Sequence, residues 1–284
     1  MRIATWNVNS LPVRLPRVEE WIEYAQPDVL CMQETKQADA AFPHGAFATL
    51  GYETAHHGDG RWNGVALVSR VGLENVGIGL NSDDDESGSR LIAADCGGVR
   101  VHSVYVPNGR SLDNDQYPVK LEWLARLRQL LADTCSPDDP VAVCGDFNVA
   151  PEDRDLWDPA AFVGETHVSP PEREALTKLE EWGLVDVFRQ LYDADELFSW
   201  WDYRAGNFHK HKGMRIDLVL MTKVLADRAR YGLIDRNARK GQKPSDHAPL
   251  FIDVDVDGTA KRATGGLSLI EASKAARRDR DSRS

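Results

Sequence analysis

Short apolar runs, each bounded by turn-forming residues, recur along most of the chain. Ten of them have the length and the β-branched or aromatic content of strands. We expect these strands at residues 3–8, 29–33, 52–56, 65–69, 91–95, 99–106, 141–145, 216–221, 228–234 and 250–256. Three longer segments repeat apolar residues at the three- and four-residue spacing of a helix with one buried face. They predict helices at residues 14–25, 117–132 and 172–182.

The order of these elements indicates an α/β protein whose sheets contain hairpins. Strands outnumber helices, and short turns such as Gly97-Gly98 join neighbouring strands, so a uniform series of βαβ units does not fit. The pattern changes once, near Asp257, after which the chain is rich in Lys, Arg, Ser and Ala. We therefore expect one catalytic domain over residues 1–256 and a basic, mobile tail over residues 257–284.

Composition narrows the class of protein. The 284 residues are 42% hydrophobic, which is enough for a sizeable core. No apolar run is long enough to cross a membrane and no secretory signal is visible, so we expect neither a membrane span nor export. The four cysteines lack Cys-x-x-Cys spacing, which predicts reduced thiols in a cytoplasmic protein. The net charge of −11 disfavours blanket binding to nucleic acid, but an acidic metal pocket with a basic rim would give the same total.

Polar side chains suited to metal and phosphate chemistry stand at the ends of five of these segments. The five deliver Asn7, Glu34, Asp146 with Asn148, Asp217, and Asp246 with His247. An Asn after a strand is more commonly a turn former, whereas an acid inside the apolar run at Asp217 needs a hydrogen-bonded partner, for which a histidine is suited. Oxygen ligands suit a hard cation such as Mg²⁺, and an Asp–His pair suits the activation of water. These segments predict a metal-dependent hydrolase of phosphate esters.

Taken together, the motifs resemble one family closely. They are Trp6-Asn7-Val8-Asn9, Gln33-Glu34-Thr35-Lys36, Tyr105-Val106-Pro107-Asn108-Gly109, Gly145-Asp146-Phe147-Asn148, Phe198-Ser199-Trp200-Trp201-Asp202-Tyr203-Arg204, Arg215-Ile216-Asp217 and Ser245-Asp246-His247. In order and spacing, from residue 1 to about 256, they are similar to the exonuclease III family of abasic-site endonucleases, within the endonuclease/exonuclease/phosphatase superfamily. The resemblance implies a four-layer α/β sandwich, like that of deoxyribonuclease I, in which two packed mixed β-sheets are flanked by helices.

The same resemblance implies a metal site. Glu34 would be the principal ligand of Mg²⁺, for which Mn²⁺ could substitute, with Asn7 beside it. Asp246 would complete the shell directly or through water, and Asp146 and Asn148 are further candidates. One Glu with neutral amides is sufficient because Mg²⁺ retains several of its waters.

The catalytic roles are implied in the same way. His247, oriented by Asp217, would meet the scissile phosphate. Asp146 would align or deprotonate the attacking water, or protonate the leaving oxygen. Asn148 and Tyr105 would hold the phosphate as its negative charge grows, because donors placed in advance stabilise that charge most in the transition state.

Contacts with DNA are expected around these motifs. By the resemblance, Trp200, Met214 and Ile216 line a pocket for the sugar of an abasic site, with ordinary core packing as the alternative. The basic or polar residues nearest the motifs are the further candidates for DNA contacts: Lys36, Arg61, Asn108, Arg110, His209 and Lys210.

The remaining candidates are expected to play no part in the chemistry. Asn9 stands where some members of the family carry Asp, and we expect it to be peripheral. His56, His57, His102 and His167 are isolated in strand or loop contexts and are predicted to be structural.

The predicted function is Mg²⁺-dependent hydrolysis of DNA phosphodiesters by a monomer. The substrates would be double-stranded DNA with abasic sites, incised on their 5′ side, or with blocked or recessed 3′ ends, which would be trimmed. A phosphatase of the same superfamily, acting on a phosphorylated small molecule or lipid, is the alternative, and the segment around Trp200 disfavours it. A DNA-binding protein without activity is a third hypothesis, disfavoured because every proposed catalytic position carries a competent side chain.

Overall fold

Two six-stranded mixed sheets form the body of the protein in the computed structural model, which describes residues 1–80 and 88–256. The first sheet has the order β11 (Ala229–Ile234), β12 (Leu250–Val254), β1 (Arg2–Asn7), β2 (Val29–Gln33), β4 (Val65–Ser69) and β3 (Glu53–His57). The second has the order β5 (Glu74–Ile78), β6 (Leu91–Cys96), β7 (Val99–Tyr105), β8 (Val141–Asp146), β10 (Asp217–Thr222) and β9 (Leu184–Asp186). In each sheet one central pair is parallel, β1 with β2 and β7 with β8, and the other pairs are antiparallel.

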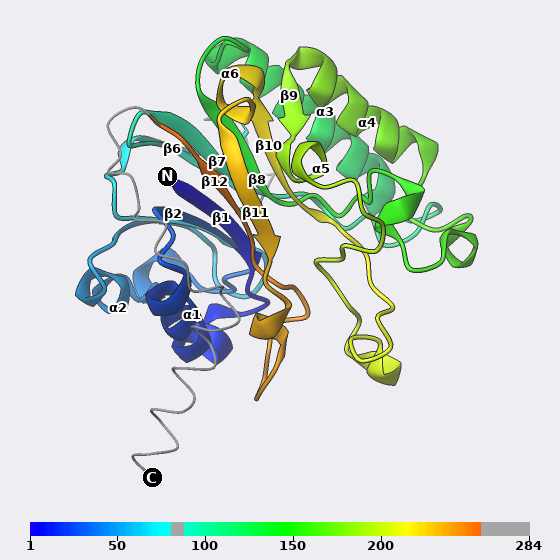
Figure 1. Ribbon diagram of the computed structural model, residues 1–284, viewed down its shortest axis with the longest axis horizontal. Coiled ribbons are helices and arrows are strands. Elements are labelled where there is room, and N and C mark those ends of the chain that lie inside the picture. Colours follow the sequence, from blue (N-terminus) through cyan, green and yellow to red (C-terminus); the bar gives the residue numbers. More distant parts are fainter. Residues whose placement is uncertain (81–87, 257–284) are drawn as a thin grey trace.

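Helices cover the outer face of each sheet (Figure 1). The first sheet carries α1 (Leu11–Ala25) and α2 (His44–Thr49), and the second carries α3 (Gln116–Thr134) and α4 (Pro170–Trp182). Two shorter helices, α5 (Val187–Leu191) and α6 (Lys223–Ala226), adjoin β9 and β10.

Three apolar layers hold this arrangement together. Ile3 and Cys31 belong to the cluster between the sheets, whereas their neighbours Ala4 and Leu30 belong to the cluster beneath α1 and α2. Successive side chains of a strand point to opposite faces, so the central strands are apolar on both sides and read as continuous runs. A third cluster lies between the second sheet and helices α3 and α4.

The predicted four-layer α/β sandwich is confirmed, and all ten expected strands are present within a few residues of their predicted bounds. The pattern missed β5, whose sequence Glu-Asn-Val-Gly-Ile is largely exposed, and β9, which has only three residues. It also missed the short helices α2, α5 and α6, and it began α1 too late, since a proline in the first turn lets that helix start at Leu11. The predicted mobile tail lies outside the described residues, and no helix within them is both long and apolar enough to span a bilayer.

Candidate active site

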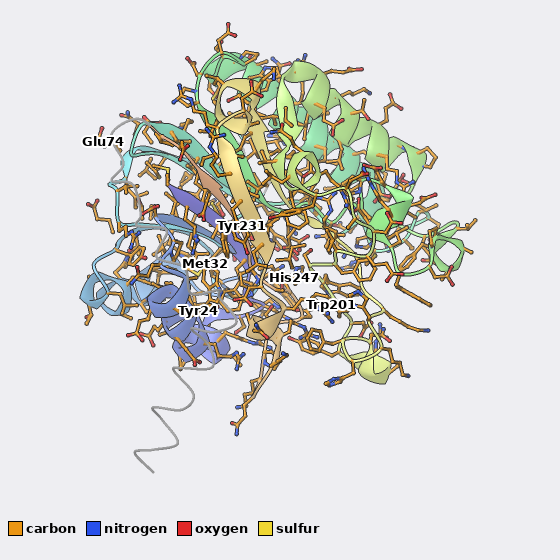
Figure 2. All side chains as sticks on the ribbon, viewed as in Figure 1. Tyr24, Met32, Glu74, Trp201, Tyr231 and His247 are labelled. Carbon is orange, nitrogen blue, oxygen red and sulfur yellow. The ribbon has the colours of Figure 1, made fainter. Side chains whose placement is uncertain are left out.

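The polar side chains singled out by the sequence meet at one edge of the sandwich. Tyr105, at the end of β7, is paired in register with Asp146 at the end of the parallel strand β8, and Asp217 opens the antiparallel strand β10 opposite Asp146. From the facing sheet, Asn7 ends β1 and Glu34 directly follows the parallel strand β2. Figure 2 shows His247 at this edge and Glu74 at the opposite one. The topology therefore brings together residues that are more than 200 positions apart in the chain.

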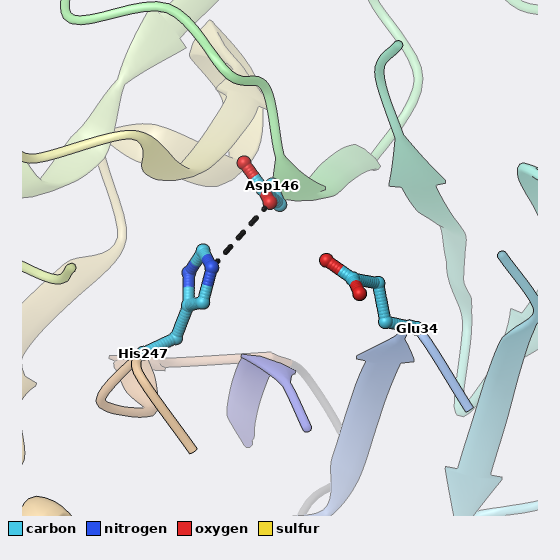
Figure 3. A group of neighbouring side chains, drawn as sticks. All are labelled: Glu34, Asp146 and His247. Atoms are coloured by element: carbon cyan, nitrogen blue, oxygen red, sulfur yellow. Dashed lines mark ion pairs between the residues drawn. The ribbon is translucent and has the colours of Figure 1, made fainter. Parts of the chain in front are cut away.

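Glu34, Asp146 and His247 form the centre of the site (Figure 3). One potential ligand atom of each lies within 4.8 Å of those of the others, and His247 Nε2 is 3.7 Å from Asp146 Oδ2. Asn7 joins the two carboxylates, because its Nδ2 donates to Glu34 Oε1 at 2.8 Å and to Asp146 Oδ2 at 2.9 Å. These two hydrogen bonds link the Glu34 carboxylate of the first sheet to the Asp146 carboxylate of the second.

His247 and Asp217 form a buried pair. The distance from His247 Nδ1 to Asp217 Oδ2 is 2.8 Å, and Ser199 Oγ donates to the same oxygen at 2.6 Å. Burial alone would lower the pKa of His247, but the charges of Asp217 and Asp146 outweigh it and raise that pKa to about 10. His247 is therefore a cation at neutral pH, with Nε2 turned toward Asp146. His247 is the partner that the sequence predicted for Asp217, and the structure shows this pair.

The two carboxylates of the centre have opposite electrostatic environments. Burial raises the pKa of Asp146 to about 7, against the opposing charge of His247. Burial would also raise the pKa of Glu34, but the Lys36 ammonium, 2.8 Å from Glu34 Oε2, holds it below its ordinary value. Near neutral pH, Glu34 is a fixed anion while Asp146 can take up and release a proton.

The donor chemistry of the site fits a hard divalent cation. Glu34 and Asp146 supply carboxylate oxygens, and Asn7 Oδ1 is an amide oxygen at the same edge. His247 presents only Nε2 to this centre, because its Nδ1 is hydrogen-bonded to Asp217. Carboxylate and amide oxygens of this kind are the ligands that a hard divalent cation prefers.

Asn148 and Asn108 form a pair of hydrogen-bonded amides, the amide arm, at the side of this centre. Asn148 Oδ1 accepts from Asn108 Nδ2 at 3.0 Å, and the Asn148 backbone N–H donates to Asp146 Oδ1 at 2.9 Å. Its φ of 51° is left-handed, so the extended backbone of β8, which ends at Asp146, does not continue to Asn148. Tyr105 lies on the same side, and burial raises the pKa of its hydroxyl well above the ordinary value, so it remains a donor at neutral pH.

Residues 4–247 match the model of the endonuclease/exonuclease/phosphatase family. The chain belongs to this family. It is 34% identical over 269 residues to exodeoxyribonuclease III of Haemophilus influenzae, a match that covers 89% of this chain and 99% of the relative.

Two solved structures are also similar and place the chain in the exonuclease III branch of the family. One is an AP endonuclease from Archaeoglobus fulgidus, with a TM-score of 0.87 and 38% identity over 90% of this chain and all of that one. The other is a 3′ phosphatase from Neisseria bound to a product DNA hairpin, with a TM-score of 0.87 and 36% identity over the same shares of the two chains. The predicted family is confirmed.

Asp246 in this nuclease-family site is not one of the three residues of the central cluster. Its two oxygens accept from Asn9 Nδ2 at 2.9 Å and from Trp200 Nε1 at 3.1 Å. Asp246 and His247 thus serve different partners, as adjacent residues should. Asn9 is not peripheral, since its Oδ1 also accepts from Lys36 Nζ at 2.7 Å and so links Asp246 to the ion pair of Glu34.

The three residues predicted to line a sugar pocket differ in their exposure. Met214 and Ile216 are 4% and 2% exposed and pack with Leu156, so core packing, the alternative considered above, describes their state in this structure. Trp200 is half-buried at the edge of that cluster, and its backbone bridges to Met214 and His247. Trp200 is the member of the trio available to a substrate.

The predicted DNA contacts lie on the rim of the site or on neighbouring loops. Lys36 is paired with Glu34, and Arg61 is exposed in the loop between β3 and β4. Asn108 is exposed and bonded to Asn148, and the exposed Arg110 donates its backbone N–H to Asn108. His209 and Lys210 are exposed in the turns of residues 206–212. The two residues that follow are half-buried, because Lys212 packs over the Trp157 ring and His211 contacts Phe198.

The sequence missed the surroundings of Asn148. His167 is not merely structural, because its Nε2 lies 3.2 Å from Asn148 Oδ1 and 3.1 Å from Asn108 Nδ2. Lys120, a buried cation behind them, was also missed. The position of Lys120 on the apolar face of a predicted helix was the one sequence feature that could have indicated its role. No sequence feature indicated that of His167. By contrast, His102 is buried in β7, with a pKa lowered to about 4 by burial, as a structural histidine should be.

Proposed function

We propose that this protein is a Mg²⁺-dependent nuclease of DNA repair that incises DNA 5′ to abasic sites and trims 3′ ends. Its substrate would be double-stranded DNA with abasic sites or blocked or recessed 3′ ends, bound by a monomer in the cytoplasm. Exodeoxyribonuclease III, AP endonuclease and 3′ phosphatase are the names of similar proteins, and they share hydrolysis of a phosphate ester at a DNA sugar.

The observation that carries the proposal is the position of Asp146 between a buried cation and an amide. Asp146 faces charged His247 on one side and is held by Asn7 on the other, with a pKa of about 7. A carboxylate with this pKa can accept a proton from water at neutral pH, and a charged imidazole beside it can stabilise a phosphate oxygen. This pairing suits in-line attack of water on a phosphodiester.

The remaining residues would take the following roles. Glu34, with Asn7 and Asp246 near it, would hold Mg²⁺, which supplies charge neutralisation at the phosphate and lowers the pKa of water. Asp217 would keep the His247 ring charged and oriented. Asn148 and Tyr105 would donate to the non-bridging oxygens, where negative charge grows.

Incubation of the purified protein with a duplex containing one abasic site tests the proposal. We expect a single incision 5′ to the site in the presence of Mg²⁺ and none with chelator. A duplex with a 3′-phosphate should lose that phosphate under the same conditions. Activity only on a phosphorylated small molecule or lipid would favour the superfamily phosphatase, and DNA binding without cleavage would indicate an inactive site.

Trp200→Ala should reduce abasic incision about tenfold more than removal of a 3′-phosphate. An abasic sugar must leave the stack to be cut, and the apolar face of Trp200 would contact it, whereas a terminal phosphate needs no displaced sugar. Loss of ~1–2 kcal/mol of apolar contact corresponds to about tenfold. The measurement is the ratio of the two rates on matched duplexes.

Trp200→Phe is the matched control, because it keeps an apolar ring but removes the hydrogen bond to Asp246. Its ratio of rates should stay near that of the wild type. Equal losses of both activities in Trp200→Ala, with a lower melting temperature, would assign Trp200 to the core.

A further inference from the structure

A buried ion pair lies behind the amide arm of the site. Lys120 of α3 and Glu172 of α4 form a salt bridge, and both side chains are 0% exposed. Removing two charges from water costs several kcal/mol, and an apolar pair of the same size usually stabilises a fold as well. Stability is therefore a weak reason for this pair, and none of the roles proposed above uses it.

The Lys120 ammonium is directed at the backbone of two site residues. Besides Glu172, its Nζ donates to the carbonyl oxygen of Asn148 at 2.7 Å and to that of Asn108 at 3.2 Å. These three partners account for the three N–H groups of an ammonium. The side chains of the same two asparagines are hydrogen-bonded to each other, Asn108 Nδ2 to Asn148 Oδ1. Lys120 therefore binds the backbone of both residues of the amide arm.

Glu172 in turn fixes the place of Lys120. Its carboxylate accepts from Thr166 Oγ1 at 2.7 Å and from the backbone N–H of His167 and of Ser169, each at 2.9 Å. Capping of α4 by Ser169 explains one of its oxygens, which leaves the other for Lys120, the Thr166 hydroxyl and the His167 backbone N–H. The segment that carries His167 to Asn148 is therefore tied to the same carboxylate.

Asn148 needs such support because its backbone is left-handed, at φ 51°. A residue other than glycine adopts this conformation at a cost and keeps it only where the surroundings determine it. The N–H is held by Asp146, the side-chain amide donates to the Val106 carbonyl at 3.0 Å, and Lys120 holds the carbonyl. Without Lys120, the carbonyl would be buried with no cation to fix its direction.

We propose that Lys120, with Glu172 as its counter-ion, is a positioning residue that sets Asn148 and Asn108 for contact with the phosphate of the substrate. It acts through their backbone carbonyls and does not touch DNA, since it is fully buried. The inference rests on the proposed nuclease function for its kinetic test, although the geometry it assigns to Asn148 does not depend on any activity.

The test replaces both charges at once, as Lys120→Met/Glu172→Gln, so that no lone charge is left in the interior. Turnover should fall about 10–100-fold, somewhat less than the loss of a whole transition-state donor, while KM changes less than about threefold. In an Asn148→Ala background the same double change should lower turnover by a further factor of less than about three, because the effects of residues that act through one another are non-additive. Glu172→Gln alone, which can still form the capping box, should show the same coupling with a smaller loss.

Arg2→Met is the control for a general loss of stability. It breaks the ion pair of Arg2 with Asp253, 2.7 Å apart at the far end of β1 from Asn7, and should lower the melting temperature but leave turnover unchanged in both backgrounds. All assays are run well below the lowest melting temperature. If the double change lowered turnover by the same factor in the Asn148→Ala background as in the wild type, the proposal would be overturned.

A readout without substrate separates this inference from the proposed function. The backbone and side-chain amide signals of Asn148 in ¹H–¹⁵N spectra should shift in Glu172→Gln and in the double variant, but not in Arg2→Met. Unchanged signals would overturn the positioning role even in an active nuclease. Shifted signals in a protein that cleaves no DNA would support it and refute the nuclease function.

Discussion

Asp146→Asn is expected to lose about 10²–10⁴-fold in turnover while the protein remains folded, the range for a residue that transfers a proton in the transition state. Asn has nearly the shape of Asp but one acceptor oxygen instead of two, so it can keep the hydrogen bond from the Asn148 backbone and loses the one that Asn7 Nδ2 donates to the other oxygen. It cannot accept a proton, and it removes the negative charge that faces His247. Rates on the abasic duplex and melting temperatures of the two proteins provide the measurement.

Glu34→Gln is the matched comparison, because it should be impaired for another reason. Its loss is one of metal affinity, so high Mg²⁺ should restore part of its activity, whereas Asp146→Asn should gain nothing from added metal. Near-native turnover in Asp146→Asn would remove Asp146 from the mechanism. Rescue of both variants by Mg²⁺ would make both carboxylates metal ligands only.

The role of Asp146 as a base also predicts the direction in which kcat/KM changes with pH. A base is active in its deprotonated form, so kcat/KM should rise with pH through the pKa of Asp146, about 7 without metal. A nearby cation favours the carboxylate, so increasing Mg²⁺ should move this rise to lower pH. The rise should be absent from Asp146→Asn.

The sequence pattern was sufficient for the strands and for the polar residues at their ends, whereas the four-layer sandwich was implied by the family resemblance. Buried strands are continuous apolar runs, and a polar residue at the end of one can lie only at an edge of the sheet. Asp217 was the clearest case, since an acid within such a run requires a partner, and the partner is His247. The pairing of distant strands, which sequence patterns do not specify, was supplied by the family resemblance.

The rest could not be predicted because it depends on backbone conformation and on packing between loops. The left-handed turn at Asn148 changes the direction of its side chain, and no local pattern marks it. His167 reaches the site only because Glu172 holds its backbone, and Met214 is buried because Leu156 packs on it. These are contacts between segments that are far apart or irregular, where hydrophobic periodicity carries no information.

The pairing of His247 with Asp217 predicts kinetics that are strongly non-additive. His247→Ala alone should cost about as much turnover as His247→Ala/Asp217→Ala, because Asp217 acts only by orienting and charging the ring. Independent, multiplicative losses would show that Asp217 has a different role, such as holding Ser199, its other hydrogen-bond partner.

The alkaline limb of the pH profile tests the same pair by a different route. In the wild type, kcat/KM should begin to fall only near pH 10, where His247 loses its proton. Asp217→Asn removes the charge that opposes the effect of burial, so the pKa of His247 should drop and the fall should move to lower pH. At pH 6, where the ring is more fully protonated, the variant should recover part of its activity relative to the wild type. An alkaline limb that stays in place in Asp217→Asn would contradict the prediction, because the charge of Asp217 contributes more than that of Asp146 to raising the pKa of His247.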